Sequence, residues 1–213
     1  MTMKTNLPIF AAAALAGVIA LGGGIFAASH LFAPSTLDSD AIGATYLDGG
    51  REVTDFSLVT HDGTPFTEDD FRDGWSLVFF GFTNCPDICP TAMIDLARVQ
   101  ESLNGEDRLR TLFITVDPDR DTKERLAAYV PAFHESFTGI TGDLEQIDRL
   151  ARDLGIVHIR HNENGETDYM VDHGSAILLI NPEGRLQAIF QAPHRPDDMS
   201  RDLQAILDHH AGR

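Results

Sequence analysis

The chain has 213 residues, enough for one well-cored domain with a small appendage and too few for an ordinary large multidomain enzyme. Asp and Glu number 33 against 16 Lys and Arg, so the formal net charge is −17 at pH 7. Such an acidic surface repels the phosphate backbone, and we expect no nucleic-acid partner. The two Cys residues are too few for a disulfide scaffold but sufficient for one redox pair or part of a metal site.

The N-terminal segment predicts a membrane anchor. Residues 7–28 carry no charged side chain and are almost entirely apolar or Gly, and a run of that length crosses a bilayer core as a helix. Lys4 precedes the run and acidic residues follow it, so we expect the remaining chain on the exported side, which is the periplasm in a bacterium. A secretory signal cleaved near Ala28 is the alternative. The expected layout is a membrane anchor or uncleaved signal at 1–29, a linker at 30–50 and a folded domain at 51–213.

Beyond the linker, apolar runs alternate with amphipathic ones. A short hairpin is expected at residues 56–66, and residues 77–82 predict a strand buried on both faces because polar positions do not alternate with apolar ones. The order of elements predicts an α/β fold of thioredoxin-like type, in which helices flank a mixed central sheet. Apolar positions at the 3.6-residue period predict helices around residues 93–103, 126–133, 144–154 and 199–207, and further strands are expected at 112–116, 156–159, 176–180 and 186–190.

Both thiols lie where the predicted strand 77–82 ends and the first helix begins. Cys85 and Cys89 are separated by three residues, a spacing that can close a disulfide, form a redox pair or bring two thiolates to one metal ion. Pro90 suits the first helical position, which predicts Cys89 as the helix N-cap and favours its thiolate form. We favour redox or metal chemistry over a structural disulfide, because closing so short a loop contributes little entropic stabilisation.

Nine His residues could complete a metal site, and His173 differs from the others in its context. It precedes the predicted buried strand 176–180, and in a thioredoxin-like sheet the loop before that strand faces the helix that carries the thiols. From spacing alone, a structural role for this residue stays open. The other eight lie in the linker, in turns, at helix ends, on a strand edge or near the C-terminus: His30, His61, His134, His158, His161, His194, His209 and His210.

Three segments together resemble the SCO/SenC family of copper chaperones, and they occur in that family's order. They are Phe80–Thr91, which contains both thiols, Val116–Thr122, and Asp168–His173. The likeness extends over roughly residues 53–209 and follows the same kind of N-terminal anchor. It implies a thioredoxin-like fold that binds one copper ion through Cys85, Cys89 and His173.

The resemblance also implies a function. A membrane-anchored carrier would deliver copper to the binuclear copper centre of a respiratory cytochrome c oxidase, with the subunit that holds this centre, and another copper carrier, as partners. Two thiolates and an imidazole suit Cu(I), whereas structural Zn²⁺ takes four ligands.

Two other functions would use the same residues. One is a thiol-disulfide reductase that acts on the partner's cysteines with Cys85 and Cys89 as its redox pair, and the other is a copper or redox sensor. Against the reductase, the segment 170–175 lacks the Pro that thioredoxin-type oxidoreductases usually carry before the following strand.

Several residues near these motifs have two interpretations each. Asp172 either accepts a hydrogen bond from the His173 ring or points away from it, and Met170 is expected to pack in the core rather than to offer its sulfur. The carboxylates at positions 117, 119 and 121 fit a hard-metal or acid/base site, but we expect Asp121 to cap a helix, with Glu124 as its reciprocal partner.

Overall fold

The computed structural model describes residues 23, 42–103, 109–161 and 169–212. The predicted anchor and most of the predicted linker therefore lie outside the described residues. Within the described part of the chain, none of the helices has the length and apolar character needed to cross a membrane. Residues 38–206 form one compact unit, which carries all of the sites below, and residues 1–37 and 207–213 form the other.

An eight-stranded sheet forms the centre of the first unit, in the order β1-β10-β9-β4-β5-β6-β2-β3. The neighbours β4, β5 and β6 run parallel, and the other pairs are antiparallel, so the sheet is mixed. The strands are β1 (Thr45–Glu52), β2 (Ser57–Thr60), β3 (Pro65–Thr67), β4 (Trp75–Gly81), β5 (Leu109–Thr115), β6 (Thr138–Thr141), β9 (Ile177–Ile180) and β10 (Arg185–Phe190).

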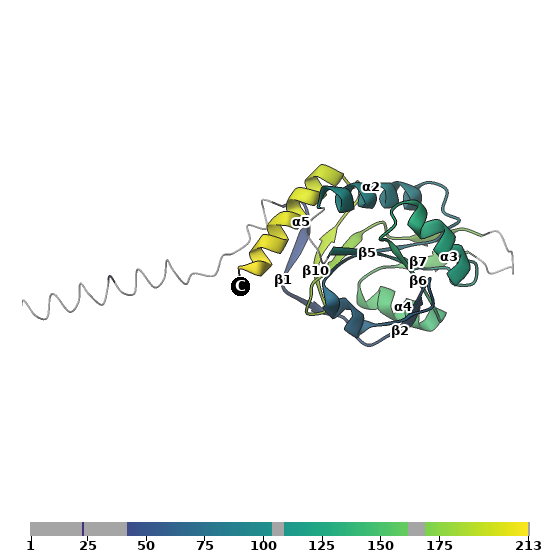
Figure 1. Cartoon of the computed structure of the whole chain (residues 1–213). Helices are drawn as coiled ribbons and strands as arrows, with labels where there is room; N and C mark the ends of the chain where they lie inside the picture. The colour runs from purple at the N-terminus through teal and green to yellow at the C-terminus, as the bar shows by residue number, and fades with distance from the viewer. Residues whose placement is uncertain (1–22, 24–41, 104–108, 162–168, 213) are drawn as a thin grey trace, which may run out of the picture. The chain divides into compact units, whose positions relative to one another are not determined.

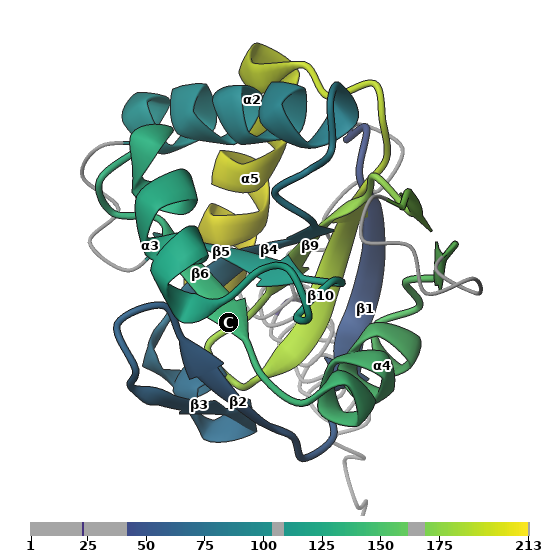
Figure 2. The same ribbon diagram turned by 90° about the vertical axis from the view of Figure 1, so that its right-hand side faces the viewer.

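Helices cover the sheet, and Figures 1 and 2 show α2 and α4 on opposite sides of it. Every residue of β4 is buried, because this strand lies inside the sheet, between β9 and β5, and helices cover the sheet faces to which its side chains point. The prediction of a mixed sheet flanked by helices, with a central strand buried on both faces, is confirmed. The helices are η1 (Glu68–Asp73), α2 (Ile88–Ser102), α3 (Lys123–Tyr129), η2 (Val130–Ala132), α4 (Leu144–Asp153) and α5 (Pro196–Ala211).

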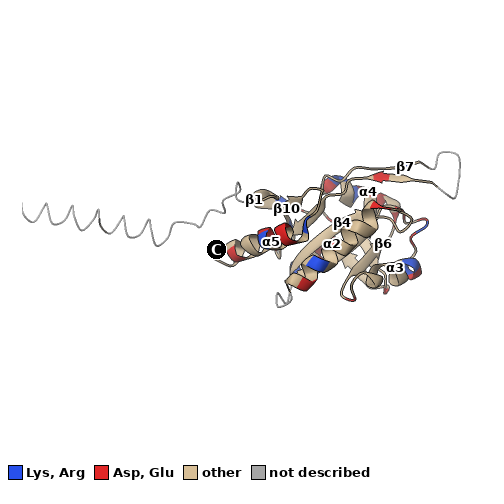
Figure 3. Cartoon of the chain, turned by 90° about the horizontal axis from the view of Figure 1, so that it is seen from above, with Lys and Arg blue, Asp and Glu red and all other residues tan. Residues whose placement is uncertain are grey.

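A separate two-stranded ribbon consists of β7 (His158–Arg160) and β8 (Val171–His173). The strands are antiparallel, with His158 opposite His173 and Arg160 opposite Val171. Residues 156–159 were predicted as a strand, but the strand that forms there belongs to this ribbon and not to the main sheet. Figure 3 shows both acidic and basic residues on α5, whose sequence includes Asp197, Asp198 and Arg201.

Three strands were not predicted from the sequence, and β1 is the most informative of them. It occupies residues 45–50 of the predicted linker and pairs with β10. Gly49 and Gly50 have positive φ angles of 76° and 64°, and the pairing register shifts between Tyr46 and Arg51. This Gly-rich irregularity interrupts the alternation by which a strand is recognised. The other two, β6 and β8, are only four and three residues long.

Candidate metal centre

The segment between β4 and α2 carries both thiols, but the helix begins earlier than the sequence predicted. Asp87 is the N-cap and Ile88 the first helical residue, so Cys89 lies inside the first turn. The prediction that Cys89 caps the helix is wrong. Pro90 is the third helical residue and is tolerated there, because the N–H groups of the first turn have no partner within the helix.

The Cys89 side chain is fully buried against the end of β4. Gly81, the last residue of β4, leaves room for it: a Cβ atom at this position would lie 3.0 Å from Cys89 Sγ and 2.8 Å from a ring carbon of Phe113. A larger residue would therefore displace the thiol. Burial raises the pKa of the Cys89 thiol, so the protonated form is favoured in the metal-free protein, contrary to the thiolate that the predicted cap implied.

Cys85 differs from Cys89 in its exposure. It is only partly buried, and its Sγ accepts a hydrogen bond of 3.4 Å from the backbone N–H of Cys89. Both cysteines are free thiols. The pair therefore presents one sulfur from the protein interior and one from the surface.

His173, the last residue of β8, brings a ring nitrogen to the buried thiol. Its Nε2 lies 3.2 Å from Cys89 Sγ, and its Nδ1 lies 3.0 Å from the carbonyl oxygen of Gly174. Because a carbonyl oxygen can only accept, Nδ1 carries the proton in the neutral ring and the lone pair of Nε2 faces the sulfur. Burial lowers the pKa of His173, which favours this neutral form. The ring packs edge-on against Phe79 and Phe82, at centroid distances of 6.0 Å and 5.8 Å.

The structure thus brings together all three residues that the sequence analysis singled out. The ligand atoms of Cys85, Cys89 and His173 all lie within 4.8 Å of one another. Within the described residues, no other group of three or more Cys, His, Asp or Glu side chains has ligand atoms this close. Two soft sulfurs and one imidazole nitrogen form a donor set that suits Cu(I) and leaves a tetrahedral Zn²⁺ site one ligand short.

A cavity of about 250 Å³ opens beside the three ligands and includes Cys85 and His173 in its lining. Met170 also lines it and is half-exposed, so the expectation that Met170 packs in the core is wrong. A larger cavity, of about 520 Å³, is lined by residues of α4 and β7 and by none of the three ligands. Of these two cavities, the smaller is therefore the one that adjoins the three ligands.

Asp172 does not orient the His173 ring. Its carboxylate lies 2.8 Å from Nε2 of His161, on the exposed side of the ribbon, while the carbonyl of Gly174 holds the proton-bearing nitrogen of His173. Adjacent residues of a strand point to opposite faces, so Asp172 and His173 of β8 face away from each other. The second interpretation of Asp172, in which it points away, is the one observed.

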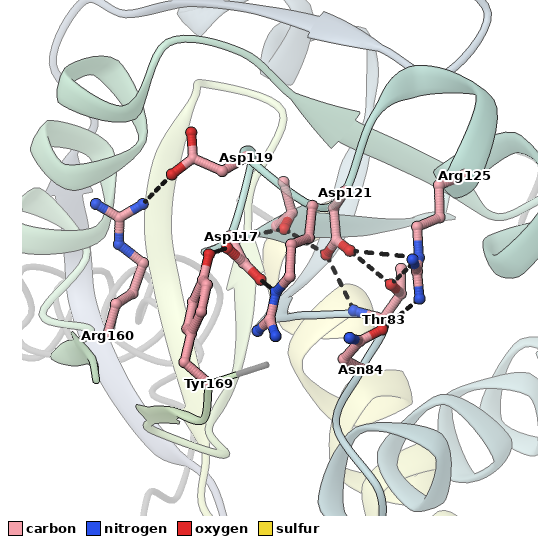
Figure 4. A network of polar contacts seen from close by, with 10 residues as sticks. Thr83, Asn84, Asp117, Asp119, Asp121, Arg125, Arg160 and Tyr169 are labelled. Carbon is pink, nitrogen blue, oxygen red and sulfur yellow. Dashed lines mark hydrogen bonds and ion pairs between the residues drawn. The ribbon is translucent and has the colours of Figure 1, made fainter. Parts of the chain in front are cut away.

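The acidic loop between β5 and α3 also differs from expectation. Thr122, not Asp121, is the N-cap of α3, and its hydroxyl oxygen accepts the backbone N–H of Arg125. Asp117 and Asp121 are both fully buried, and hydrogen bonds from neighbouring side chains occupy their carboxylates (Figure 4). The sequence signal that could have found this arrangement is the pairing of these carboxylates with Arg120 and Arg125 in the same segment.

Comparisons with known proteins agree with this geometry. The sequence profile of the SCO1/SenC family matches residues 44–208, which is most of the chain. The chain therefore belongs to the SCO1/SenC family. The match begins at Ala44, one residue before β1, and so includes the strand that the sequence analysis had assigned to the linker.

Individual relatives and structures make the likeness more specific. A protein of Stutzerimonas stutzeri described as copper-binding is 38% identical over 160 residues, which cover 74% of this chain and 78% of that protein. The mitochondrial SCO1 homolog of Mus musculus is 34% identical over 205 residues, covering 92% of this chain and 70% of the relative.

Two solved structures with copper bound share the fold. The Arabidopsis thaliana ScoI structure is 33% identical, with a TM-score of 0.65, and the alignment covers 73% of this chain and 98% of that one. The yeast Sco1 structure is 28% identical, with a TM-score of 0.68, and covers 74% of this chain and 89% of that one. The α/β fold is therefore the thioredoxin-like fold of the Sco proteins.

Proposed function

We propose that this chain is a membrane-anchored copper carrier that delivers one copper ion to the binuclear copper centre of a respiratory cytochrome c oxidase. The observation that carries the proposal is the convergence of two thiols and one imidazole within 4.8 Å. Copper as the metal is supported by the copper-binding relative and by the two copper-bound Sco structures. The oxidase as destination is supported by membership of the SCO1/SenC family.

The three ligands differ in ways that suit uptake and release. Cys89 and the Nε2 of His173 already face each other in the interior, so they hold the ion from the protein side. Cys85 is only partly buried and lines the cavity, so an incoming donor on the acceptor reaches the ion beside this sulfur first. Transfer then proceeds by ligand exchange, with each protein ligand displaced in turn and without net oxidation of the thiols.

The ligand set is tested by replacing each ligand in the full-length chain. Cys85→Ser, Cys89→Ser and His173→Ala each remove one of three donors, and each should weaken copper retention by more than the roughly 10–100-fold that loss of an outer-sphere partner costs. Copper per chain is measured by elemental analysis after competition with a Cu(I) chelator. His134→Ala is the matched control, because His134 bonds Ser136 instead. Unchanged retention in His173→Ala would remove that residue from the site.

A reductase remains the competing function, because both cysteines are free and adjacent. The raised pKa of Cys89 disfavours it as an attacking thiolate, which leaves Cys85 as the nucleophile for such a reaction. His173→Ala separates the two functions, since it removes a metal ligand but neither redox sulfur. Loss of acceptor maturation with an unchanged thiol-exchange rate supports the carrier, and normal maturation supports the reductase.

The membrane anchor and the exported location belong to the same proposal and rest on the apolar segment 7–28. The mature protein should stay with the membrane fraction through an alkaline wash, and a reporter fused after Arg213 should be active only on the exported side. A mature form that starts near His30 and is released by the wash would instead establish a cleaved signal.

A further inference from the structure

The loop between β5 and α3, residues 116–122, contains two fully buried carboxylates that do not belong to the metal ligands. Asp117 and Asp121 are both 0% exposed. Burying a carboxylate is costly unless hydrogen bonds compensate it, so the partners of these two groups indicate why they are there.

Asp121 binds the segment that leads to the thiols. It accepts hydrogen bonds from the backbone N–H of Thr83, at 3.0 Å, and from the Thr83 hydroxyl, at 2.5 Å. Arg125 donates in turn to the Thr83 hydroxyl oxygen, at 2.6 Å, and to the side-chain carbonyl of Asn84 (Figure 4). Thr83 and Asn84 directly precede Cys85, so these contacts hold in place the backbone that leads to the first thiol.

Asp117 binds the segment that leads to the imidazole. The hydroxyl of Tyr169 donates to one of its carboxylate oxygens, and Nε of Arg120 donates to the other. The Arg120 guanidinium also lies 3.7 Å from the centroid of the Tyr169 ring and 5.8 Å from that of Phe82, the ring that packs against His173. Tyr169 is four residues before His173, and β8 begins two residues after it.

One hydroxyl connects the Asp121 carboxylate to the backbone of Asp117. Thr115 Oγ1 donates to Asp121, at 2.7 Å, and accepts the backbone N–H of Asp117, at 2.9 Å. Hydrogen bonds therefore link Thr83, which precedes the thiols, to Asp121, Thr115 and the backbone of Asp117, and the Asp117 side chain continues the connection to Tyr169, which precedes the imidazole.

We propose that the loop 116–122 is a clamp that positions the two halves of the metal centre, with Asp117, Arg120 and Tyr169 as the positioning residues for His173. The inference rests on the proposed copper site. A ribbon of two three-residue strands has little stability of its own, so the distance between His173 and the thiols depends on such an external attachment.

The contacts of the carboxylates favour this role over a hard-metal site in the same loop. Both oxygens of Asp117 and both oxygens of Asp121 already accept from side chains or backbone. The third carboxylate, Asp119, is mostly exposed and pairs instead with Arg160 at 3.3 Å. A cation at this place would first have to displace those donors.

Tyr169→Phe in the full-length chain is the sharpest test, because it deletes one hydroxyl and keeps the ring that lies against Arg120. In the metal-free protein, hydrogen exchange of the β8 amides should be faster than in wild type, while that of the β4 amides is unchanged. In the Cu(I)-loaded protein, release to a chelator should be about 10–100-fold faster, and X-ray absorption should show a weaker nitrogen contribution at unchanged sulfur coordination.

Tyr129→Phe is the matched control, because the Tyr129 hydroxyl is buried and makes no hydrogen bond within the described residues. It should leave β8 exchange as in wild type, and exchange is the readout for this control, because burial and the charges of Cys89 and Cys85 raise the pKa of Tyr129, which places its hydroxyl near the thiols. Asp117→Asn, which weakens the acceptor and keeps its shape, should shift the same readouts as Tyr169→Phe.

The clamp is overturned if Tyr169→Phe has the hydrogen exchange, copper release rate and copper spectrum of wild type. It is also overturned if the variant loses global stability while the nitrogen contribution to the copper spectrum is unchanged. Failure of the wild-type chain to bind copper would instead count against the proposed function. In that case hydrogen exchange of the β8 amides, measured on the metal-free protein, still tests the clamp.

Discussion

The two halves of the metal centre differ in how the fold supports them. The thiols follow β4, whose seven residues are all buried, and Cys89 itself is fully buried. His173 belongs to a ribbon outside the main sheet, whose strands have only three residues each and include Ile159, which is 55% exposed. One half is part of the core, and the other is attached to it.

For the proposed function, this difference explains how one site could both hold a metal ion and release it. Core residues cannot move far without a large loss of packing, so the thiol segment keeps its geometry through a transfer. A short ribbon held by a few polar and aromatic contacts can change position at a smaller free-energy cost. The predictions below test this asymmetry, from the largest expected effect to the smallest.

The core under the thiols should tolerate truncation poorly. Phe80, in β4, is fully buried, and Phe80→Ala should lower the free energy of unfolding by about 3–5 kcal/mol. The loss is measured by urea unfolding followed through Trp75, the only Trp of the chain. Phe80→Leu should give a smaller loss in the same direction. A change below about 1 kcal/mol in Phe80→Ala would contradict the view that this strand is the rigid half.

Glycine replacements on the two sides of the site should differ in their effects. Gly81→Ala places a methyl group 2.8 Å from Phe113 and 3.0 Å from the Cys89 sulfur, and such overpacking should cost about 1–3 kcal/mol and weaken copper retention. Gly174→Ala, beside His173, meets no atom within 4 Å and should change stability by less than about 1 kcal/mol. For both variants, urea unfolding measures the change in stability and chelator competition measures copper retention. Equal effects would mean that the two halves are equally packed.

The protons released on copper binding should come from the thiol half. Burial raises the pKa of Cys89, so its thiol is protonated near neutral pH and must lose a proton to bind copper. Burial lowers the pKa of His173 from its ordinary 6.5, so near neutral pH the imidazole is already neutral and releases no proton. Copper affinity should therefore rise with pH, about tenfold per unit for each proton released, without a change of slope near pH 6.5.

Chelator competition from about pH 5.5 to 8, corrected for protonation of the chelator, measures this dependence. Cys89→Ser should lower the slope by one proton. A steeper slope that appears only below pH 6.5 would show that His173 titrates there and that burial does not keep it neutral.

The sequence predicted the core half of this site better than the attached half. Residues 77–82 are continuously apolar, and that pattern alone identifies a buried strand with the thiols at its end. His173 was assigned through family resemblance, because β8 has three residues and no periodicity to detect. The position of Cys89 within the helix was mistaken, since Pro is compatible with any residue of the first turn.

The positioning contacts could not be predicted because they join distant parts of the chain. Asp121 and Thr83 are 38 residues apart, and Tyr169 and Asp117 are 52 apart, so neither pair has a local signature. Local pattern favoured a helix cap for Asp121, whereas the folded chain supplies two hydroxyl donors that hold it in the interior. Burial of a carboxylate becomes visible only when the strands are assembled.

The smallest effect is expected at the exposed face of the ribbon. Ile159 is 55% exposed in β7 and lies opposite Asp172, so Ile159→Ala removes little buried apolar surface. The change in the free energy of unfolding should stay within about 0.5 kcal/mol, and copper retention should equal that of wild type. Urea unfolding and chelator competition, run beside Phe80→Ala, give the contrast directly. A loss above about 1 kcal/mol would mean that the ribbon packs as part of the core, and the asymmetry between the two halves would then not hold.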